Sequence, residues 1–488
     1  MIYDAQFLEG SSELLLSRMS RRRLLQVMGY SAAGVAGTAI IAACGGPNPP
    51  GPVNGTPVST GTVTATLGTT HQITPYFLGY NNVPTHSPSW TVPGVVDAAK
   101  KLKPGTLRYP GGTVANYWDW RSGWLFPGAP MGNAPRTPYG LEELQIAVNA
   151  TGAKPIYVLN MLTSDLPSQL QMLGKATNMG LPVELVELGN EFYLSLPKEY
   201  IAKFPTGRDY GAMATEWIKA IRDRFPNAKI AAVGGVPVSN PFSDPRKANW
   251  NQDLLQSLQG ADVLTMHPYV SVPTAADAID VPSLENTVSS RWQQFESEIQ
   301  ALPSNMRIWF TEYNFVDPQR KVFRSWADGV LAAEMSLNFL QENRIELICF
   351  YDMIGKTGNE VVFYNLQGQG SANSGLDQFA LTAAGWSMSL LGDTIYGMTS
   401  AQQLSFGSTP APLGWIFTNG TTRKAFIINS SSESFAWENI STISGMKQFQ
   451  QLTSDPSQLI TSTNTPTGSG GSLGSQLVLP AYSVTQLK

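Results

Sequence analysis

Two glutamates in this sequence end largely apolar runs, where a charged side chain is costly: Glu191 ends the run 185–191 and Glu312 ends the run 308–312. Two carboxyl groups can cleave a glycosidic bond if one protonates the leaving oxygen while the other attacks the anomeric carbon, with roughly 5 Å between them. We therefore interpret Glu191 as the acid/base and Glu312 as the nucleophile of a retaining glycoside hydrolase. The alternative is that each glutamate caps a helix or pairs with a cation.

The elements around these glutamates are predicted to form a (β/α)8 TIM barrel, because short apolar runs alternate with longer amphipathic segments. The predicted strands cover residues 77–81, 106–110, 155–160, 185–191, 229–234, 263–267, 308–312 and the run through Cys349 to Asp352. The predicted helices include residues 140–150, 210–224, 250–258, 284–301 and 325–342. Glu191 then ends strand four and Glu312 ends strand seven, so both are expected at the C-terminal mouth of the barrel, where the active sites of such barrels lie.

Both ends of the folded region are expected to build an accessory domain. After residue 391 the pattern changes to short alternating strands with Ser, Thr and Gly turns, which predicts a C-terminal β-sandwich. The alternating stretch 62–67 is expected to add a strand to it, and the low-complexity segment 461–475 is expected to be a flexible hairpin loop. The predicted sandwich strands include residues 414–418, 423–429 and 476–487. We therefore divide the folded region into a strand at 61–75 that joins the sandwich, a catalytic barrel at 76–390 and the sandwich at 391–488.

The N-terminal segment has the pattern of an export signal. An arginine-rich stretch at 20–25 precedes an uncharged apolar run at 27–43, as in a twin-arginine signal. The run ends in Ala-Ala-Cys-Gly, which resembles a lipoprotein cleavage box, so residues 1–44 are interpreted as a signal and Cys44 as the lipidated residue. The alternative is a helix that is never cut. Residues 45–60 are rich in Pro, Gly, Asn and Thr and predict a flexible linker. We expect an exported protein that is periplasmic, surface-anchored or extracellular, and that contacts the membrane only through its lipid.

Composition excludes several other classes. Charged residues make up 14 % of the chain and the formal net charge is -4, so no basic field exists that would hold a nucleic acid. With Cys44 set aside only Cys349 remains, so no intramolecular disulfide is possible, and its apolar surroundings predict a buried, inert thiol. The three histidines show no metal-ligand spacing. We predict no metal, no cofactor and a carbohydrate as the only substrate partner.

Several motifs resemble one clan of enzymes. Gly-Asn-Glu at 189–191 and Trp-Phe-Thr-Glu-Tyr at 309–313 resemble the acid/base and nucleophile motifs of the retaining glycosidases with catalytic glutamates on barrel strands four and seven. The resemblance covers about residues 75 to 488. The motifs at 107–113 and 117–120 are similar to a strand-two motif of the α-L-arabinofuranosidases and related to one in the heparanase and β-glucuronidase family, and residues 479–484 resemble the last sandwich strand of these enzymes. Phe192 stands where many clan members have proline, which leaves the choice of family open.

Neighbouring residues are given supporting roles on the same basis. Asn190 would point its amide at the sugar hydroxyl next to the anomeric carbon, or it is a turn residue. Arg108, at the end of strand two, would keep Glu312 ionised, or it forms a structural ion pair. Tyr269 resembles the tyrosine of the clan that donates a hydrogen bond to the nucleophile. His267 would orient Tyr269 or line the sugar pocket, unless it is a core histidine.

The remaining substrate contacts are assigned to Trp118 and Tyr351, which would stack on sugar rings, and to Asn81 at the end of strand one. Trp118 and Tyr351 could equally belong to the core. The pKa of Glu191 is expected to be raised by the nearby anionic Glu312 and by apolar walls, since the acid must be protonated when catalysis begins.

The substrate choice suggested by the resemblance lies between an α-L-arabinofuranoside and a β-linked hexuronide, in a plant or matrix polysaccharide or oligosaccharide. The alternative from a different functional class is a surface lipoprotein that binds carbohydrate and has lost catalytic activity. The presence of both glutamates argues against that alternative.

Overall fold

The computed structural model describes residues 61–130, 139–238, 242, 244–273, 279–317, 319–365, 375–408 and 410–488. The predicted signal, its Cys44 and the predicted linker at 45–60 lie outside these residues. Within the described ranges, no helix combines the length and the apolar character needed to cross a membrane.

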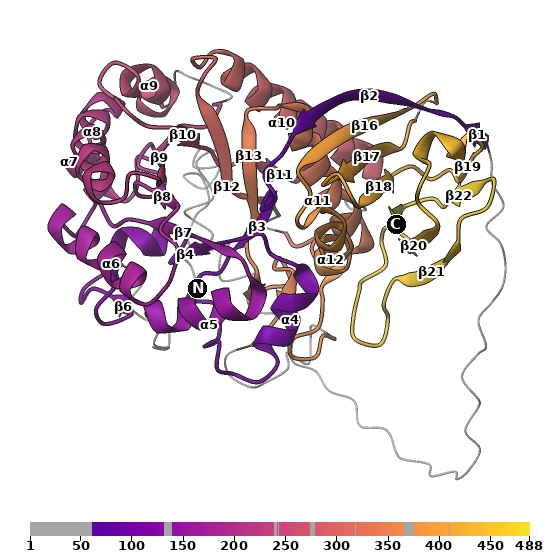
Figure 1. Ribbon diagram of the computed structural model, residues 1–488, viewed down its shortest axis with the longest axis horizontal. Coiled ribbons are helices and arrows are strands. Elements are labelled where there is room, and N and C mark those ends of the chain that lie inside the picture. Colours follow the sequence, from indigo (N-terminus) through magenta and orange to yellow (C-terminus); the bar gives the residue numbers. More distant parts are fainter. Residues whose placement is uncertain are drawn as a thin grey trace, which may run out of the picture. The chain divides into compact units, whose positions relative to one another are not determined.

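Eight parallel strands close into a barrel at the centre of the larger domain (Figure 1). They are β3 (Leu78–Asn81), β4 (Thr106–Tyr109), β7 (Lys154–Val158), β8 (Leu185–Glu187), β9 (Lys229–Val233), β10 (Val263–Thr265), β12 (Arg307–Val316) and β13 (Ile345–Phe350). Each strand pairs with the next, and β13 pairs back with β3, which closes the sheet. The predicted (β/α)8 fold is confirmed.

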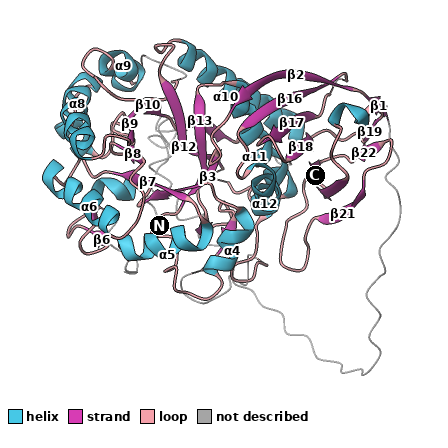
Figure 2. Cartoon of the chain, viewed as in Figure 1, coloured by secondary structure: helices cyan, strands magenta, loops and turns pink. Residues whose placement is uncertain are grey.

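Helices surround this barrel on the outside (Figure 2). They are α4 (Val95–Leu102), α5 (Leu141–Thr151), α6 (Leu166–Asn178), α7 (Lys198–Lys203), α8 (Gly207–Arg224), α9 (Pro245–Leu254), α10 (Val281–Gln300), α11 (Trp326–Asn338) and α12 (Ala383–Ile395). Three of them share a start signal in which an aspartate accepts a hydrogen bond from a backbone N–H of the first turn and a proline occupies that turn. The capping residues are Asp165, Asp244 and Asp280. Short elements complete the domain: β5 (Trp118–Asp119), β6 (Trp124–Leu125), β11 (Tyr269–Ser271), β14 (Ile354–Gly355) and β15 (Val362–Phe363).

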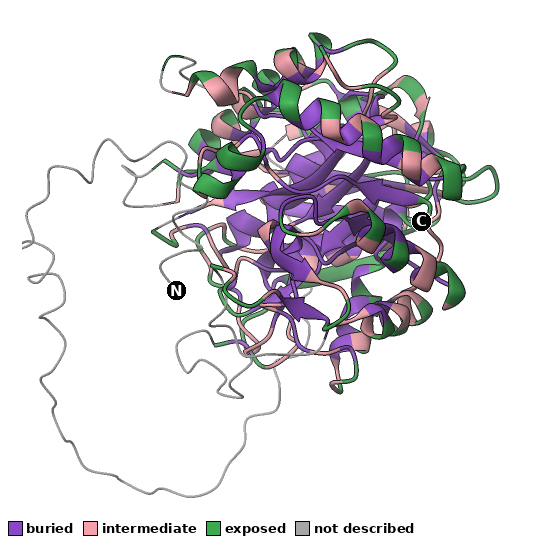
Figure 3. Ribbon diagram, turned by 90° about the vertical axis from the view of Figure 1, so that its left-hand side faces the viewer, coloured by how far each residue is buried: buried purple, intermediate pink, exposed green. Residues whose placement is uncertain are grey.

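The barrel interior is packed with side chains. Figure 3 shows the strands as buried and the outer faces of the helices as exposed. A cluster around Trp309 and Cys349 fills the inside of the barrel, with Leu185, Val263 and Leu347 among its members. Burial raises the pKa of the Cys349 thiol to about 12. The thiol is therefore protonated and enclosed at neutral pH, in agreement with the expected inert role.

The smaller domain is a β-sandwich assembled from both ends of the described chain. Its larger sheet is antiparallel and has the order β2 (Ala65–Gln72), β16 (Ser400–Phe406), β17 (Leu413–Thr418), β18 (Arg423–Asn429), β23 (Ser483–Leu487), β20 (Gln448–Thr453) and β21 (Thr467–Ser472). Its smaller sheet has the order β1 (Gly61–Val63), β19 (Phe435–Trp437) and β22 (Leu477–Leu479). Apolar side chains from the two sheets, including Val63, Phe406 and Trp437, form one core between them. The predicted accessory sandwich is confirmed.

Two local expectations about this region were wrong. The segment 461–475 is not wholly a loop, because β21 pairs residue by residue with β20. Ladder hydrogen bonds use only the backbone, so an exposed edge strand of Thr, Ser and Gly can form without burying side chains. The boundary expected at residue 390 falls inside α12, which packs against both α11 of the barrel and β18 of the sandwich.

Candidate active site

Glu312 lies within β12, where the strand is irregular. Phe310 pairs with Ile348 and Tyr313 pairs with Phe350, so β12 carries one extra residue at Glu312. Such a β-bulge re-aims a side chain and is common beside active sites. The carboxylate of Glu312 accepts one hydrogen bond from Arg108 Nη1 at 2.6 Å and another from the Tyr269 hydroxyl at 2.7 Å. Both oxygens of the proposed nucleophile are therefore held in place.

Glu191 lies in the turn that follows β8 and not at the end of the strand itself, because β8 ends at Glu187. Its backbone has a φ of 49°, in the left-handed region. The turn is anchored by Phe192, whose buried ring packs against Tyr200, Phe204 and Tyr210. A Cβ at Gly189 would lie 2.1 Å from the Phe192 ring, so glycine is required there. The phenylalanine found in place of the clan's proline thus fixes the loop that carries Glu191.

The two glutamates meet at the open end of the barrel. One carboxylate oxygen of Glu191 and one of Glu312 lie within 4.8 Å of each other and of a His267 ring nitrogen. The Glu191 side chain is 15 % exposed and the Glu312 side chain is 6 % exposed, so both can be reached from the mouth although they are mostly enclosed. A bond placed between them would contact both carboxyl groups at once.

Arg108 links Glu312 to a second buried carboxylate. Its Nε and Nη2 atoms donate to Glu187 at 2.7 and 2.8 Å, and Nη1 donates to Glu312. Burial alone would lower the pKa of Arg108, but the charges of Glu187 and Glu312 and their hydrogen bonds raise it above its ordinary value. The guanidinium is therefore a fixed cation that forms a buried ion pair with Glu187 and a hydrogen bond to Glu312, and its expected effect on the charge of Glu312 stays a prediction.

The side chain of His267 contacts Glu191, while its backbone carbonyl accepts a hydrogen bond from the Tyr269 N–H at 3.0 Å. Its Nδ1 lies 2.9 Å from Glu191 Oε1, and its Nε2 lies 3.1 Å from the Thr311 hydroxyl. Thr311 donates its own proton to Glu187, so it must accept one from His267 Nε2. Nε2 therefore carries a hydrogen, and the remaining proton is shared between Nδ1 and Glu191.

The pKa expectation for Glu191 was wrong in direction. Burial raises the pKa of Glu191, but the hydrogen bond and charge of His267, the Tyr193 hydroxyl at 2.8 Å and the charge of Lys247 outweigh it, so the pKa is lowered. Burial lowers the pKa of His267, but the charges of Glu312 and Glu191 and the hydrogen bond to Glu191 outweigh it, so that pKa is raised. The sequence argument omitted the imidazole beside the acid.

Asn190 is clamped by its backbone and by one side-chain atom. Asn116 bonds both its N–H, at 3.1 Å, and its carbonyl, at 2.8 Å. Its Oδ1 accepts from Arg108 Nη2 at 2.8 Å, while its Nδ2 is buried and has no hydrogen-bond partner among the residues that the structure describes. A buried donor without a partner is costly, so this amide is available for a hydroxyl of a bound sugar.

Two other residues predicted to contact the substrate have different roles: Asn81 positions Arg108, and Trp118 belongs to the core. Asn81 is fully buried, accepts from Arg108 Nη1 at 3.1 Å and donates to the Thr311 carbonyl at 2.6 Å, so it positions Arg108 and does not contact substrate. Trp118 was predicted wrongly as a sugar platform, because it is 2 % exposed and its ring packs between Tyr109 and Trp124.

Tyr351 remains beside the site. Its ring meets Tyr269 edge-on, with the ring centres 6.2 Å apart. A Cβ at Gly112 would lie 3.9 Å from the Tyr351 ring and 3.6 Å from Glu312 Oε1. Tyr351 therefore borders the same space as the proposed nucleophile and stays a candidate for stacking on a sugar.

The sequence analysis missed four residues that build the site: Glu187, Thr311, Tyr193 and Asn116. Glu187 had a signal, since it is a charge inside an apolar strand and needs a cation such as Arg108. The other three are uncharged, so their residue types gave no signal, although Thr311 and Tyr193 lie close to the two glutamates in sequence. Asn116 reaches Asn190 only through the fold.

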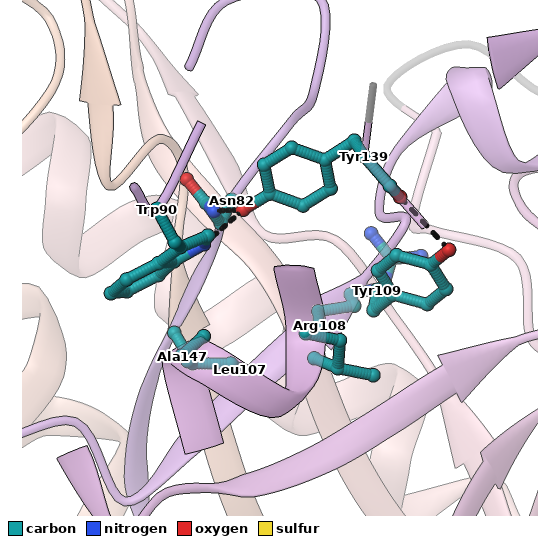
Figure 4. A pocket seen from close by; sticks show the side chains of 8 residues that line it. Asn82, Trp90, Leu107, Arg108, Tyr109, Tyr139 and Ala147 are labelled. Carbon is teal, nitrogen blue, oxygen red and sulfur yellow. Dashed lines mark hydrogen bonds between the residues drawn. The ribbon is translucent and has the colours of Figure 1, made fainter. Parts of the chain in front are cut away.

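A small cavity lies beside β4, and Leu107, Arg108 and Tyr109 are among its lining residues (Figure 4). It is lined by aromatic and apolar side chains, and its polar groups satisfy one another: the Tyr139 hydroxyl accepts from Asn82 and Trp90, and Tyr109 donates to the Tyr139 carbonyl at 3.0 Å. It is a gap in the packing of the barrel wall and not the substrate site.

The group of Glu191, His267 and Glu312 also has a composition that a divalent cation could use, with ligand atoms within 4.8 Å of one another. The absence of a metal requirement stays a prediction, which is tested below.

The fold defines a TIM barrel with an appended β-sandwich of the type found in α-L-arabinofuranosidases. Two similar solved structures are the α-L-arabinofuranosidase of Thermotoga maritima (15 % identity, TM-score 0.61, 87 % of this chain and 99 % of that chain) and a family 51 α-L-arabinofuranosidase of Bifidobacterium longum (14 %, 0.64, 88 % and 99 %). A third is a 4-O-α-L-rhamnosyl-β-D-glucuronidase of Fusarium oxysporum (15 %, 0.62, 87 % and 99 %). No protein-family model and no curated protein matches the chain. The expected resemblance thus holds for the fold.

Proposed function

We propose that this protein is a retaining glycoside hydrolase that uses Glu312 as nucleophile and Glu191 as acid/base. The observation that carries the proposal is the approach of the two carboxylates to within 4.8 Å at the barrel mouth. This spacing suits attack by one carboxylate and proton transfer by the other, whereas inverting enzymes keep their carboxyl groups roughly 6.5 to 9.5 Å apart to admit a water.

The first step uses the charges already in place. Arg108 and Tyr269 each donate a hydrogen bond to one oxygen of Glu312 and so hold the carboxylate in position to attack the anomeric carbon. As the new C–O bond forms, the leaving oxygen takes the proton that Glu191 shares with His267. The unpartnered Asn190 Nδ2 donates to the neighbouring sugar hydroxyl, where a hydrogen bond strengthens as charge develops.

The second step reverses the proton transfer. Glu191 and His267 together accept a proton from water, whose oxygen attacks the anomeric carbon and releases Glu312. Tyr193 donates to Glu191 and stabilises its ionised form in this step. One residue thus serves both half-reactions.

For the sugar, an α-L-arabinofuranoside is the first candidate and a β-D-glucuronide is the second, since the similar structures include α-L-arabinofuranosidases and a rhamnosyl-glucuronidase. A panel of 4-nitrophenyl glycosides with the full-length chain tests both. Glu312→Ala should abolish release of nitrophenol. Glu191→Ala should lose roughly 10²- to 10⁴-fold on glycosides with poor leaving groups and less on nitrophenyl glycosides, which need little acid assistance.

Glu216→Ala, on the exposed face of α8, is the matched control and should match the parent. A Glu312→Ala variant as active as the parent would refute the nucleophile. A parent that binds oligosaccharides but hydrolyses none of the panel would favour the carbohydrate-binding lipoprotein instead.

We also propose that the protein is exported and lipidated on Cys44, on the strength of the motif at its N-terminus alone. Growth of producing bacteria with labelled palmitate should label the parent and leave Cys44→Ala unlabelled. Equal labelling of both, or of neither, would count against the assignment.

A further inference from the structure

Two cations lie near the proposed catalytic residues, and each contacts a tyrosine that donates a hydrogen bond to one of the two carboxylates. Lys247, on α9, has its ammonium 5.5 Å from the centre of the Tyr193 ring, and Tyr193 donates to Glu191. Arg291, on α10, donates through Nε to the Tyr269 carbonyl at 3.1 Å, and Tyr269 donates to Glu312. The pair therefore borders the site on the side where β9 and β10 end.

Neither cation is neutralised by a carboxylate within the described ranges. The other donations of Arg291 go through Nη1 to the Pro237 carbonyl at 3.2 Å and to the Gln294 side chain at 2.6 Å. Among the described residues, the Lys247 ammonium contacts the Tyr193 ring, and the carboxylates of Glu191 and Asp244 act on it through their charge without forming an ion pair. Some other lysines do form ion pairs: Lys175 pairs with Glu142 at 2.7 Å and Lys229 pairs with Glu346 at 2.7 Å.

Holding these two cations partly buried without a direct ion pair is costly. Both side chains are partly buried, which disfavours a charged group. Burial lowers the pKa of Lys247 and the charge of Arg291 lowers it further, while the charges of Glu191 and Asp244 raise it, and the net effect is a lowering. Burial likewise lowers the pKa of Arg291. The two cations are near enough to repel each other, so an anion between them would offset both costs.

We propose that Lys247 and Arg291 form a subsite for an anionic group on the leaving-group sugar, such as the carboxylate of a uronate or a sulfate ester. This deepens the proposed function and rests on it. Glu191 protonates the leaving oxygen, so the groups next to Glu191 border the leaving sugar, and Lys247 reaches it across Tyr193. The substrate class is an acidic oligosaccharide whose cleaved bond precedes a charged residue.

Lys247 also affects Glu191 by its charge alone, since that charge lowers the pKa of Glu191. A change of activity in Lys247→Gln would therefore not by itself reveal a subsite. The informative quantity is discrimination between anionic and neutral sugars of similar shape, measured at the pH optimum of each variant.

The test uses the full-length chain and the best chromogenic glycoside of the panel, with D-glucuronate, glucose 6-sulfate and glucose as competing inhibitors. For the parent, at least one anionic sugar should inhibit roughly 10-fold more strongly than glucose, as expected for charge-assisted hydrogen bonds. In Lys247→Gln and Arg291→Gln the ratio should fall toward one, and Lys247→Arg should keep it. Lys219→Gln, exposed on α8, should behave as the parent.

Equal inhibition by glucose and both anions in a parent that hydrolyses the chromogenic glycoside would overturn this inference and leave the proposed function standing. A ratio that persists in Lys247→Gln and Arg291→Gln, with melting temperatures as in the parent, would overturn it as well. A parent that hydrolyses no glycoside would overturn both proposals. The stronger of the two anions identifies whether carboxylate or sulfate is preferred.

Discussion

His267 Nδ1 lies 2.9 Å from Glu191 Oε1, so the proposed acid/base shares its proton with an imidazole. The pKa of His267 is raised and that of Glu191 is lowered, which places the proton on the ring nitrogen in the free protein. Because the two groups are hydrogen-bonded, they titrate as a pair and not independently. An oxygen that becomes basic as its bond to the sugar breaks can draw this proton through Glu191.

The pH dependence of activity should reveal the proton that His267 and Glu191 share. In the parent, kcat/KM should fall on the alkaline side through a pKa above 6.5, because activity ends when the pair loses its proton. In His267→Gln only Glu191 can hold the proton, and the ordinary pKa of a glutamate is 4.5. The alkaline limb should therefore move to lower pH. His71→Gln, far away on β2, should leave it in place, and an unmoved limb in His267→Gln would show that the imidazole does not share the proton.

Arg108 should tolerate no replacement, including lysine. The guanidinium bonds Glu187 with two nitrogens and Glu312 with a third, a geometry that one ammonium cannot reproduce. Arg108→Lys should lower kcat/KM by roughly 10²-fold, the scale of a misplaced catalytic group. Arg222→Lys, at an exposed bond to Asp262, is the control and should stay within about 2-fold of the parent. Full activity of Arg108→Lys would show that the guanidinium is not needed to position Glu312.

Metal ions should inhibit and not activate. The proposed chemistry uses Glu191 and Glu312 directly, so dialysis against EDTA should leave the rate unchanged. Added Zn²⁺ should inhibit competitively, since Glu191, His267 and Glu312 offer one ligand atom each within 4.8 Å, and His267→Gln should be less sensitive. Loss of activity after EDTA, restored by Zn²⁺, would point to a metal-dependent mechanism.

A buried carboxyl far from the site should make stability depend on pH. Burial raises the pKa of Asp328 on α11 to about 8, with the charge of Asp317 adding to it and a backbone hydrogen bond from Arg324 opposing it. The folded state then holds this proton more tightly than the unfolded state, whose pKa is near 3.8. Stability from this group is complete below pH 3.8 and is lost as pH rises toward 8.

Replacing the Asp328 carboxyl with an amide should remove this loss of folding stability at higher pH. Asp328→Asn should melt at a higher temperature than the parent at pH 8, by an effect of roughly 1 to 3 kcal/mol, and nearly at the parent value at pH 4. Asp223→Asn, exposed on α8, should change the melting temperature equally at both pH values. A lower melting temperature for Asp328→Asn at pH 8 would mean that the carboxylate is stabilised in its charged form.

The barrel and its two glutamates could be predicted because each produces a pattern that is visible in the local sequence. Apolar strands alternate with amphipathic helices, and a charge at the end of an apolar run needs a reason. Trp118 was placed wrongly because an aromatic residue in a short hairpin has the same local pattern whether it packs inside or faces a sugar. Only the contacts of its ring decide between the two.

The contacts of the Glu191 side chain could likewise not be predicted from the local sequence. The strand motif gave its position to within a few residues, but its bond to Tyr193 depends on the shape of the turn after β8, and its bond to His267 depends on how that turn meets the loop after β10. The direction of its pKa follows from those bonds. Lys247 and Arg291 likewise reach the site only through the packing of α9 and α10.

The most direct test of the central claim is to trap the covalent intermediate. The full-length chain is incubated with an activated 2-deoxy-2-fluoro glycoside of the sugar that the nitrophenyl panel identifies, and the labelled peptide is mapped by mass spectrometry. The account predicts one sugar per chain, attached to Glu312, with Glu191→Ala losing the sugar more slowly because the second step lacks its base. A label on any other residue, or hydrolysis with inverted configuration and no label, would contradict it.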